Sequence, residues 1–361
     1  MKVYFDHQIF SMQRYGGISR YFANIYNSLK DHGHTDCKLL VLYSKNAYIQ
    51  DQKFPLSPFL GERLLKKQHK LDRWNKRYSK YMIKKNDFDL LHPTYYNPYF
   101  LNKLKKPFVL TVHDMIHELF PEFFSPHDHF VPFKRATITR ADHIIAISES
   151  TKRDLQHIFN IPEEKISVVY HGYQEGGAVQ ADFTPPFKDY VLYVGDRPGY
   201  KNFGRMVQAV KPLLERYDIN LICAGGGGFG QAEQEMLIRA GIQNRTKQIS
   251  ASEGELNALY QKATVFVYPS LYEGFGLPIL EAFKNNCPVV MSNTSCLPEV
   301  GGEAVSYFDP YHIDDMTRAI DSVLNSSDKA NQLRASGIQQ LSRFPMDKCM
   351  RETLEVYKKL I

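Results

Sequence analysis

Two carboxylates stand on either side of a glycine turn in the segment PSLYEGFGLPILEAF. Glu273 precedes Gly274 and Gly276, which permit a tight turn, and Glu281 follows one turn into a predicted helix. Pro278 suits the first helical turn, where its missing amide proton costs nothing, so the neighbouring free amides point at an anion. Because a carboxylate accepts hydrogen bonds from two adjacent hydroxyl groups, the segment suits a sugar or ribose beside a diphosphate.

The first half of the chain holds a second set of candidates. Gly16 and Gly17 end the loop after a predicted strand and begin a helix, which leaves room for phosphate or an acceptor to approach main-chain amides. A purely structural turn is the alternative. His113 lies at the carboxyl end of a predicted strand, where ligands bind in parallel sheets; a buried core histidine is the alternative there.

Strand-like apolar runs alternate with amphipathic helical patterns along the whole chain, which is typical of parallel sheets covered by crossover helices. The sequence therefore predicts an α/β protein with two Rossmann-like domains. The first helix begins near Ile18, with apolar residues on one face. In the first half we expect strands at 2–5, 38–43, 90–92, 108–113, 143–147 and 166–169.

The second half repeats the alternation. Ser252 and Glu255 have the spacing of a capping box and predict a helix start, and further helices are expected from near Phe203, Pro278 and Ile313. The expected strands are 190–194, 219–224, 264–268, 288–292 and 304–308.

The stretch YQEGGAVQADFTPPFKD breaks this pattern, because its Gly, Pro and polar residues sustain neither a helix nor a central strand. We place an interdomain linker at 173–188, between an N-terminal domain at 1–172 and a C-terminal domain at 189–345. The last segment, 346–361, is predicted to be a helix that packs back on the N-terminal domain. Two domains of this type leave a cleft between them.

Length and composition agree with a two-domain globular protein. The 361 residues exceed what one hydrophobic core holds, and 43% are apolar while 23% are charged. Five scattered cysteines without a CxxC pair fit reduced thiols in the cytosol. Neither a signal peptide nor a membrane span is expected, because Asp6 and His7 interrupt the first apolar segment and no apolar run reaches about 18 residues.

Residues 62–85 contain ten Lys or Arg against two acids, with large apolar side chains at helical spacing. This pattern predicts a basic amphipathic helix that lies on an anionic membrane surface or faces an acceptor carrying phosphate. A domain helix with a solvated basic face is the alternative. No nucleic-acid-binding motif accompanies the charge, so no nucleic acid partner is expected.

Together these motifs resemble the retaining GT-B glycosyltransferases, in particular glycosyltransferase family 4. The segment PSLYEGFGLPILEAF is similar to the E-x7-E signature of that family, and the similarity continues in RYGGISRYF, TVHDMIHELFPEFF, AISESTKRDL and YVGDRPGYKN. It covers nearly the whole chain. The resemblance implies two Rossmann-like domains with parallel sheets facing across a cleft, with the N-terminal domain on the acceptor side and the C-terminal domain binding the nucleotide sugar.

The resemblance also implies roles for individual residues. Glu281 would bind the nucleotide ribose, and Glu273 with the turn after it would hold the transferred sugar and the distal phosphate. Arg197 and Lys201 would neutralise the diphosphate, and such cations stabilise the negative charge that develops on a leaving nucleoside diphosphate. This sequence departs from the family where Asp196 intervenes between the glycine and the arginine.

In the family, the histidine matching His113 contacts the transferred sugar near the reacting centre. The predicted catalytic residues are therefore His113, Glu273, Arg197 and Lys201. The predicted donor-binding residues are Gly16, Gly17, Gly195, Arg197, Lys201, Ile249, Glu273, Gly274, Phe275, Gly276, Leu277 and Glu281.

The implied reaction moves a hexosyl group, with mannose as the candidate, from a nucleotide diphosphate sugar to a glycan or lipid-linked acceptor in surface polysaccharide biosynthesis. The donor would be GDP-mannose or a UDP-sugar, and no metal or other cofactor is expected. Retention through front-face attack is favoured over a covalent intermediate, because no clear nucleophile is present. The expected location is the cytoplasm, including peripheral association with the inner face of the cell membrane.

The alternatives are a non-catalytic GT-B partner in polysaccharide assembly, and a sugar-nucleotide epimerase or phosphorylase of the same fold. Three further patterns carry little weight. His113 and His117 have the i, i+4 spacing of zinc sites, but the general-base glutamate is absent. Asp87 and Asp89 form a DxD that we interpret as a helix exit. The run GGGGFG after a strand fits a dinucleotide loop, yet no ribose-binding acid follows.

Overall fold

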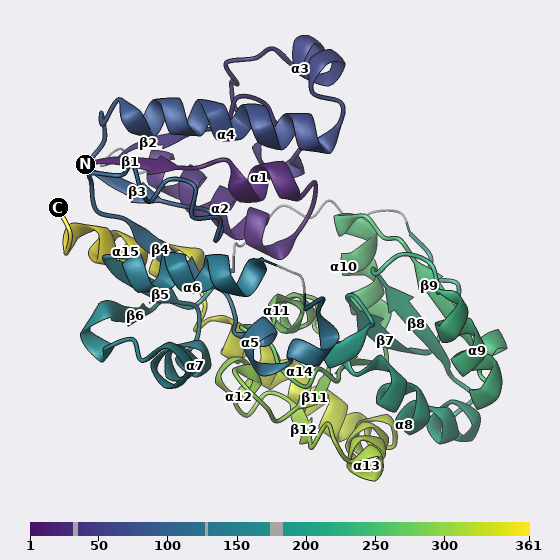
Figure 1. Ribbon diagram of the computed structural model, residues 1–361. Helices are drawn as coiled ribbons and strands as arrows, with labels where there is room; N and C mark the ends of the chain where they lie inside the picture. Colours follow the sequence, from purple (N-terminus) through teal and green to yellow (C-terminus); the bar gives the residue numbers. More distant parts are fainter. Residues whose placement is uncertain (32–34, 127–128, 174–182) are drawn as a thin grey trace. The chain divides into compact units, whose positions relative to one another are not determined.

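The chain forms two compact units (Figure 1). The N-terminal unit comprises 1–172 and 346–361, and the C-terminal unit comprises 173–345. Both contain parallel strands connected by helices, which confirms the predicted α/β class with two Rossmann-like domains. The roles predicted for the two domains stay predictions. The computed structural model describes residues 1–31, 35–126, 129–173 and 183–361.

The N-terminal unit has two three-stranded parallel sheets, ordered β2-β1-β3 and β4-β5-β6. An isolated parallel bridge between Leu91 and Phe108 links β3 to the start of β4. Since β2 and β3 lie on opposite sides of β1, the chain reverses its winding direction between β1 and β3. The strands are β1 (Lys2–Phe5), β2 (Asp36–Leu39), β3 (Leu90–His92), β4 (Val109–Val112), β5 (His143–Ala146) and β6 (Ile166–Val168).

Helices cover these sheets, and the last helix of the chain belongs to this unit. The hydroxyl of the buried Tyr357 on that helix lies 2.6 Å from Nδ1 of His92. The α-helices are α1 (Gln8–Met12), α2 (Gly17–Asp31), α3 (Pro58–Leu64), α4 (Gln68–Lys84), α5 (Ile116–Leu119), α6 (Phe130–Arg140), α7 (Glu149–Phe159) and α15 (Met346–Lys358). Short 3-10 helices occupy Ala47–Ile49, Pro121–Phe123 and Glu163–Lys165.

The prediction of one helix over 62–85 is wrong, because α3 ends at Leu64 and α4 begins at Gln68. Leu65 leaves the helical path and is 4% exposed, packed in a small cluster with Tyr43 and Leu71. Burying this side chain under the two helices is favourable enough to interrupt one helix.

The predicted strand at 38–43 is also displaced. The strand β2 ends at Leu39, and the amides of Leu42 and Tyr43 donate instead to Oδ1 of Asn75 on α4, over 2.9 and 3.2 Å. A side-chain acceptor thus replaces the sheet ladder, so a continuous apolar run lies partly outside the sheet.

The C-terminal unit has one six-stranded parallel sheet, ordered β12-β11-β10-β7-β8-β9. Its strands are β7 (Tyr190–Val194), β8 (Asn220–Ala224), β9 (Thr246–Ile249), β10 (Val265–Tyr268), β11 (Val289–Ser292) and β12 (Ser306–Phe308). Its α-helices are α8 (Phe203–Arg216), α9 (Gln231–Ala240), α10 (Glu253–Lys262), α11 (Leu277–Lys284), α12 (Leu297–Gly301), α13 (Ile313–Leu324) and α14 (Ser327–Leu341), and 3-10 helices occupy Gly199–Lys201 and Gln243–Arg245.

The capping box predicted from Ser252 and Glu255 is confirmed at the start of α10, where each side chain bonds the other residue's amide. The strand β9 and the helices α9 and α14 were not predicted. Part of the predicted linker, 174–182, lies outside the described residues. No helix in the described part of the chain is long and apolar enough to span a bilayer.

Candidate active site

The winding direction of the C-terminal sheet reverses between β7 and β10, which are neighbours. Ligands of open α/β sheets bind at such switch points, beside the carboxyl ends of the strands. Lys201 follows β7 and Glu273 follows β10, and Nζ of the lysine lies 2.6 Å from Oε1 of the glutamate. The structure therefore joins two predicted site residues across the switch point.

The ion pair is largely enclosed, with side chains 17% and 10% exposed for Lys201 and Glu273. Burial opposes the charge of the ammonium, but the negative charge of Glu273 and its hydrogen bond outweigh burial, so the pKa of Lys201 is raised. Ser270 Oγ also donates to Oε1 of Glu273, over 2.6 Å, and the amide of Glu273 donates to Oγ of Ser295. The lysine is therefore fully charged near neutral pH, and the carboxylate is fixed.

Asn202, which was not predicted, connects the two loops that carry this pair. Its backbone has a φ of +59°, a left-handed conformation that Asn tolerates well. Its side-chain amide donates to the carbonyls of Pro269 (3.0 Å) and Pro310 (2.9 Å). The only sequence signal is its place directly after Lys201, because both partners are remote in the chain.

The turn after Glu273 leads straight into α11. Gly276 has a φ of +97°, and a Cβ there would lie 2.8 Å from Cδ1 of Ile279, so both conformation and space favour glycine. Gly274 is buried in the same turn, and Leu277 begins the helix.

Two other predicted donor residues frame this turn. The ring of Phe275 packs edge-on against Phe344, with centroids 5.7 Å apart, so its side chain supports the turn from within the unit. Glu281 lies on α11, half-buried, and its Oε2 accepts a 3.4 Å hydrogen bond from the hydroxyl of Tyr260.

Arg197 follows the same strand as Lys201 but has different partners. Its Nε donates to Oε1 of Glu233 over 2.6 Å, and its Nη2 lies 3.2 Å from Oε2. Its Nη1 and Nη2 also donate to the carbonyls of Gly225, Gly226, Gly227 and Gly228. The guanidinium therefore holds a glycine loop in place, and the predicted contact of Arg197 with a diphosphate stays a prediction.

The glycine loop is shaped for this arginine. Gly225, Gly226 and Gly227 all have positive φ, and a Cβ on Gly226 would lie 2.7 Å from Nη1 of Arg197. At the base of the loop, the amide of Gly225 donates to the carbonyl of Ile249, and the amide of Gly195 donates to that of Ala224. Ile249 and Gly195 thus contribute main-chain support here, and Glu233 is a partner that no motif predicted.

His113 lies in the N-terminal unit, directly after β4, and is 5% exposed. Its amide donates to the hydroxyl of Tyr96, while its buried Nε2 has no hydrogen-bond partner among the described residues. Its ring meets that of Tyr21 edge-on and lies parallel to His171, with centroids 6.0 Å apart. Burial, then repulsion by His92 and Lys134, lowers the pKa of His113 to about 3, so the imidazole is neutral.

A buried lysine that no motif predicted supports the segment after His113. Lys134 is 0% exposed, and its Nζ donates to the carbonyl of Asp114 (2.6 Å) and to Oε2 of Glu118 (2.8 Å). Because a buried ammonium needs a charged partner, this pair fixes the loop between β4 and α5.

Gly16 and Gly17 precede or begin α2, as the sequence predicts for the helix start. A Cβ on Gly16 would clash with the side chain of Gln13, whose Oε1 accepts from the amide of Ser19. The glycine thus leaves room for the Gln13 side chain at the start of the helix, and its predicted role in donor binding stays a prediction.

The switch point of the N-terminal unit, between β1 and β3, is filled by the protein itself. The carboxylate of Asp6 is 0% exposed and accepts bonds from the side chain and amide of Gln8, from those of Thr94, and from the hydroxyl of Tyr99. Next to it, Nδ1 of His7 lies 2.8 Å from Oγ of Ser79.

The aspartates of the DxD pattern and the second histidine of the zinc-like spacing make structural contacts. Asp87 and Asp89 both bind Lys2, through Nζ (2.7 Å) and the main-chain amide (2.8 Å). The ring of His117 stacks on Phe124, with centroids 3.7 Å apart. Within 1–31, 35–126, 129–173 and 183–361, no group of three or more His, Cys, Asp or Glu is arranged to hold a metal ion.

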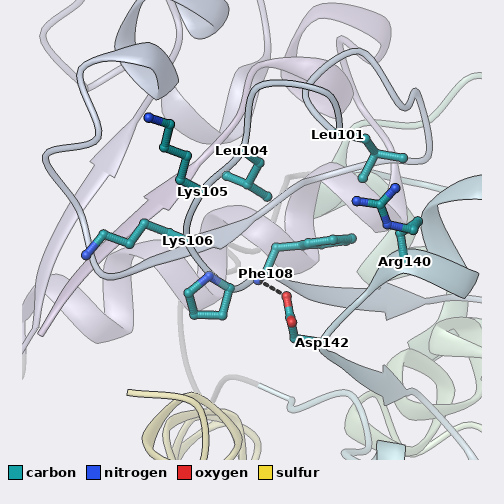
Figure 2. Close-up of a pocket in the computed structure, with 8 residues that line it drawn as sticks. Leu101, Leu104, Lys105, Lys106, Phe108, Arg140 and Asp142 are labelled. Carbon is teal, nitrogen blue, oxygen red and sulfur yellow. Dashed lines mark hydrogen bonds between the residues drawn. The ribbon is translucent and has the colours of Figure 1, made fainter.

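A separate pocket of about 420 Å³ lies at the amino ends of β4 and β5 (Figure 2). Asp142 Oδ2 accepts from the amide of Phe108 at its floor, and Lys105 and Lys106 extend away from Arg140. It contains none of the predicted site residues and lies at the opposite strand ends from His113.

Comparisons with known proteins agree with the geometry. The model of Glycosyltransferase Family 4 matches residues 15–175, and that of Glycosyl transferases group 1 matches 181–340. The chain is 29% identical to O-antigen chain mannosyltransferase B of Escherichia coli over 74% of this chain and 73% of the relative. It is 28% identical to O-antigen chain mannosyltransferase RfbU of Salmonella typhimurium over 56% of each, so that alignment spans about half of the relative.

Among solved structures, sucrose-phosphate synthase of Thermosynechococcus elongatus superimposes with a TM-score of 0.75. The superposition covers 100% of this chain and 99% of the synthase at 19% sequence identity. At that identity the likeness concerns the fold alone.

Proposed function

Because the chain belongs to the group 1 glycosyltransferases and has their GT-B fold, we propose that it transfers mannose from a nucleotide diphosphate sugar to a glycan or lipid-linked acceptor, with retention and without a metal ion. The two mannosyltransferases of O-antigen chains support both the sugar and a place in surface polysaccharide biosynthesis.

The observation that carries the proposal is the ion pair of Lys201 and Glu273 at the C-terminal switch point. The ammonium has three donors, so it keeps Glu273 while it binds an oxygen of the diphosphate. Glu273 accepts from hydroxyls of the transferred sugar, and Glu281 accepts from the ribose. By the family resemblance, the neutral His113 of the N-terminal unit is proposed to contact a sugar hydroxyl, and an uncharged imidazole suits an uncharged ligand.

In the proposed reaction the bond between the anomeric carbon and the diphosphate oxygen breaks, and the bonding electrons leave with the nucleoside diphosphate. Lys201 stabilises the charge that develops on the leaving oxygen. The acceptor hydroxyl attacks the same face of the sugar and gives its proton to the leaving phosphate. The products are a glycoside with retained configuration and a nucleoside diphosphate.

The test is a turnover assay with GDP-mannose and UDP-sugars against a membrane extract that contains lipid-linked glycans. We expect nucleoside diphosphate release that depends on both donor and acceptor, is unchanged by EDTA, and gives an α-linked product by NMR from an α-linked donor. Conversion of donor without acceptor, loss of activity in EDTA, or an inverted linkage would each contradict one part of the proposal.

A further inference from the structure

The helices α3 and α4 enclose an apolar pocket on the N-terminal unit. Its volume is about 410 Å³, and its lining combines apolar side chains with the cationic side chains of Lys70 and Arg73. Leu65 forms its buried part, while Leu64 and Trp74 are 54% and 46% exposed. The lining consists of Leu42, Leu56, Leu64, Leu65, Lys70, Arg73 and Trp74.

The outer surface around this pocket also carries large exposed apolar side chains. Phe59, 73% exposed, and Leu60 project from α3, and Tyr81 projects from α4. Folding does not account for this surface, because α4 attaches by its other face to the segment that follows β2: Asn75 binds the main chain of Tyr43, and Ser79 Oγ donates to the carbonyl of Leu40. Figure 1 shows α4 running along the β2-β1-β3 sheet.

The charge of this surface is predominantly positive, with ten Lys or Arg against two acids in 62–85. In the described part of the chain, no Lys or Arg between 62 and 85 has an acid within ion-pair distance. Arg77 and Lys85 instead lie over the rings of Trp74 and Tyr81, at 5.2 and 4.6 Å from the centroids. Aromatic rings beside lysine and arginine suit a boundary between hydrocarbon and phosphate groups.

We propose that α3 and α4 dock on an anionic bilayer, with one lipid acyl chain in the Leu64–Trp74 pocket and the lipid phosphate between Lys70 and Arg73. A protein partner would fit less well, because the cores of protein interfaces are depleted of charged residues and Lys in particular. This docking is independent of the proposed transfer reaction. It places the protein where a lipid-linked acceptor would be found.

The chain has a single tryptophan, Trp74, and it lines the pocket. Intrinsic tryptophan fluorescence therefore reports on this site alone. With vesicles of phosphatidylglycerol and phosphatidylcholine in equal parts, we expect a blue shift, protection from acrylamide, and strong quenching when the acyl chains are brominated. An emission spectrum that stays unchanged while the protein co-floats with the vesicles would overturn the proposal, since contact would then lie elsewhere.

Charge-reversal variants distinguish binding through this site from nonspecific attraction of a basic protein to anionic vesicles. Lys70→Glu with Arg73→Glu should weaken binding to anionic vesicles at least about tenfold in flotation assays. Lys105→Glu with Lys106→Glu makes the same charge change at a different pocket of this unit (Figure 2) and should leave binding within about twofold. Equal losses in both variants would show nonspecific attraction and overturn the proposal.

The acyl-chain contact needs its own variant. Leu64→Ser is at an exposed position, so the fold should persist, and it should weaken flotation about tenfold while the salt dependence of the remaining binding stays the same. Unchanged affinity in Leu64→Ser would remove the acyl chain from the proposal. Absence of binding by the unmodified protein to anionic vesicles would overturn it entirely.

Discussion

Each unit has one switch point, yet the two are built in opposite ways. In the N-terminal unit the carboxylate of Asp6 is sealed by bonds from Gln8, Thr94 and Tyr99, and nothing of it reaches solvent. In the C-terminal unit Lys201 and Glu273 form a pair beside glycine turns and keep some exposure. A sealed network stabilises a sheet, whereas a partly exposed cation beside glycine turns is available to an anion. The difference supports the proposal that the donor binds at the C-terminal switch point.

The two units also differ in their buried histidines. Twelve of the thirteen histidines precede residue 173, and four of them, His7, His92, His113 and His171, are neutral through burial. His312, the remaining one, is exposed. The buried cations Arg197 and Lys201 of the C-terminal unit each have a glutamate partner, as Lys134 of the N-terminal unit does. The two C-terminal cations both follow β7, where a diphosphate is proposed to bind.

The largest expected effect comes from removing the cation at the open switch point. Lys201→Ala should lower kcat by about a thousandfold, because no other group replaces the ammonium beside the leaving phosphate. The matched control is Lys211→Ala, an exposed lysine of the same unit, which should leave kcat unchanged. Steady-state kinetics with the donor varied would measure both, and full activity in Lys201→Ala would place the diphosphate elsewhere.

The second largest expected effect is a loss of stability in acid, which should be confined to the N-terminal unit. Burial holds the pKa of His7 at about 4 and those of His92 and His113 at about 3, below the ordinary value near 6.5. The unfolded chain therefore binds more protons, so this stability is complete above pH 6.5 and is lost as pH falls toward those values. Each such histidine contributes a slope of about 1.4 kcal/mol per pH unit.

Hydrogen exchange at pH 7 and pH 5.5 would check this expectation. Protection in the N-terminal unit should fall by about 4 kcal/mol in total, while the C-terminal unit, which has only the exposed His312, serves as the internal control. Equal acid sensitivity in both units would show that the buried imidazoles are not the cause.

A substitution at the sealed switch point of the N-terminal unit should change the stability of that unit and leave donor binding unchanged. Asp6→Asn puts an amide donor against the donors of Gln8 and Tyr99 and should destabilise the N-terminal unit by about 2 kcal/mol. The control is Asp87→Asn, an exposed surface partner of Lys2, which should leave thermal unfolding unchanged. If Asp6→Asn instead raised the donor KM at constant stability, this switch point would be a ligand site.

Sequence patterns predicted the elements whose signal is local. The strands at 2–5, 90–92 and 190–194 have the predicted bounds because each is a short apolar run that is almost wholly buried. By contrast, β9 (TKQI) is a half-exposed edge strand with little pattern, and α14 is stabilised by packing that brings Gly337 close to Phe283. Such contacts depend on the tertiary fold.

For the candidate site, the sequence indicated which residues follow which strands but did not determine their partners. Lys201 and Glu273 were both predicted, and the structure pairs them. Arg197 was given the same role as Lys201, yet its partner Glu233 is 36 positions away and lies on a helix that was not predicted. Which side chain pairs with Arg197 depends on the tertiary fold, which brings remote segments next to it. A local sequence motif contains no information about these segments.

The smallest expected effect concerns Arg197, and it tests whether the two cations really differ. If Arg197 acts by holding the glycine loop, Arg197→Ala should raise the donor KM about tenfold, the equivalent of about 1.4 kcal/mol, with kcat nearly unchanged. Glu233→Gln should reproduce part of that KM change, since it weakens the same contact from the other side. If Arg197 binds the diphosphate directly, Arg197→Ala should instead lower kcat as Lys201→Ala does, and Glu233→Gln should leave kcat intact. The ratio of the two kinetic constants in these variants decides whether the arginine positions the loop or neutralises the leaving group.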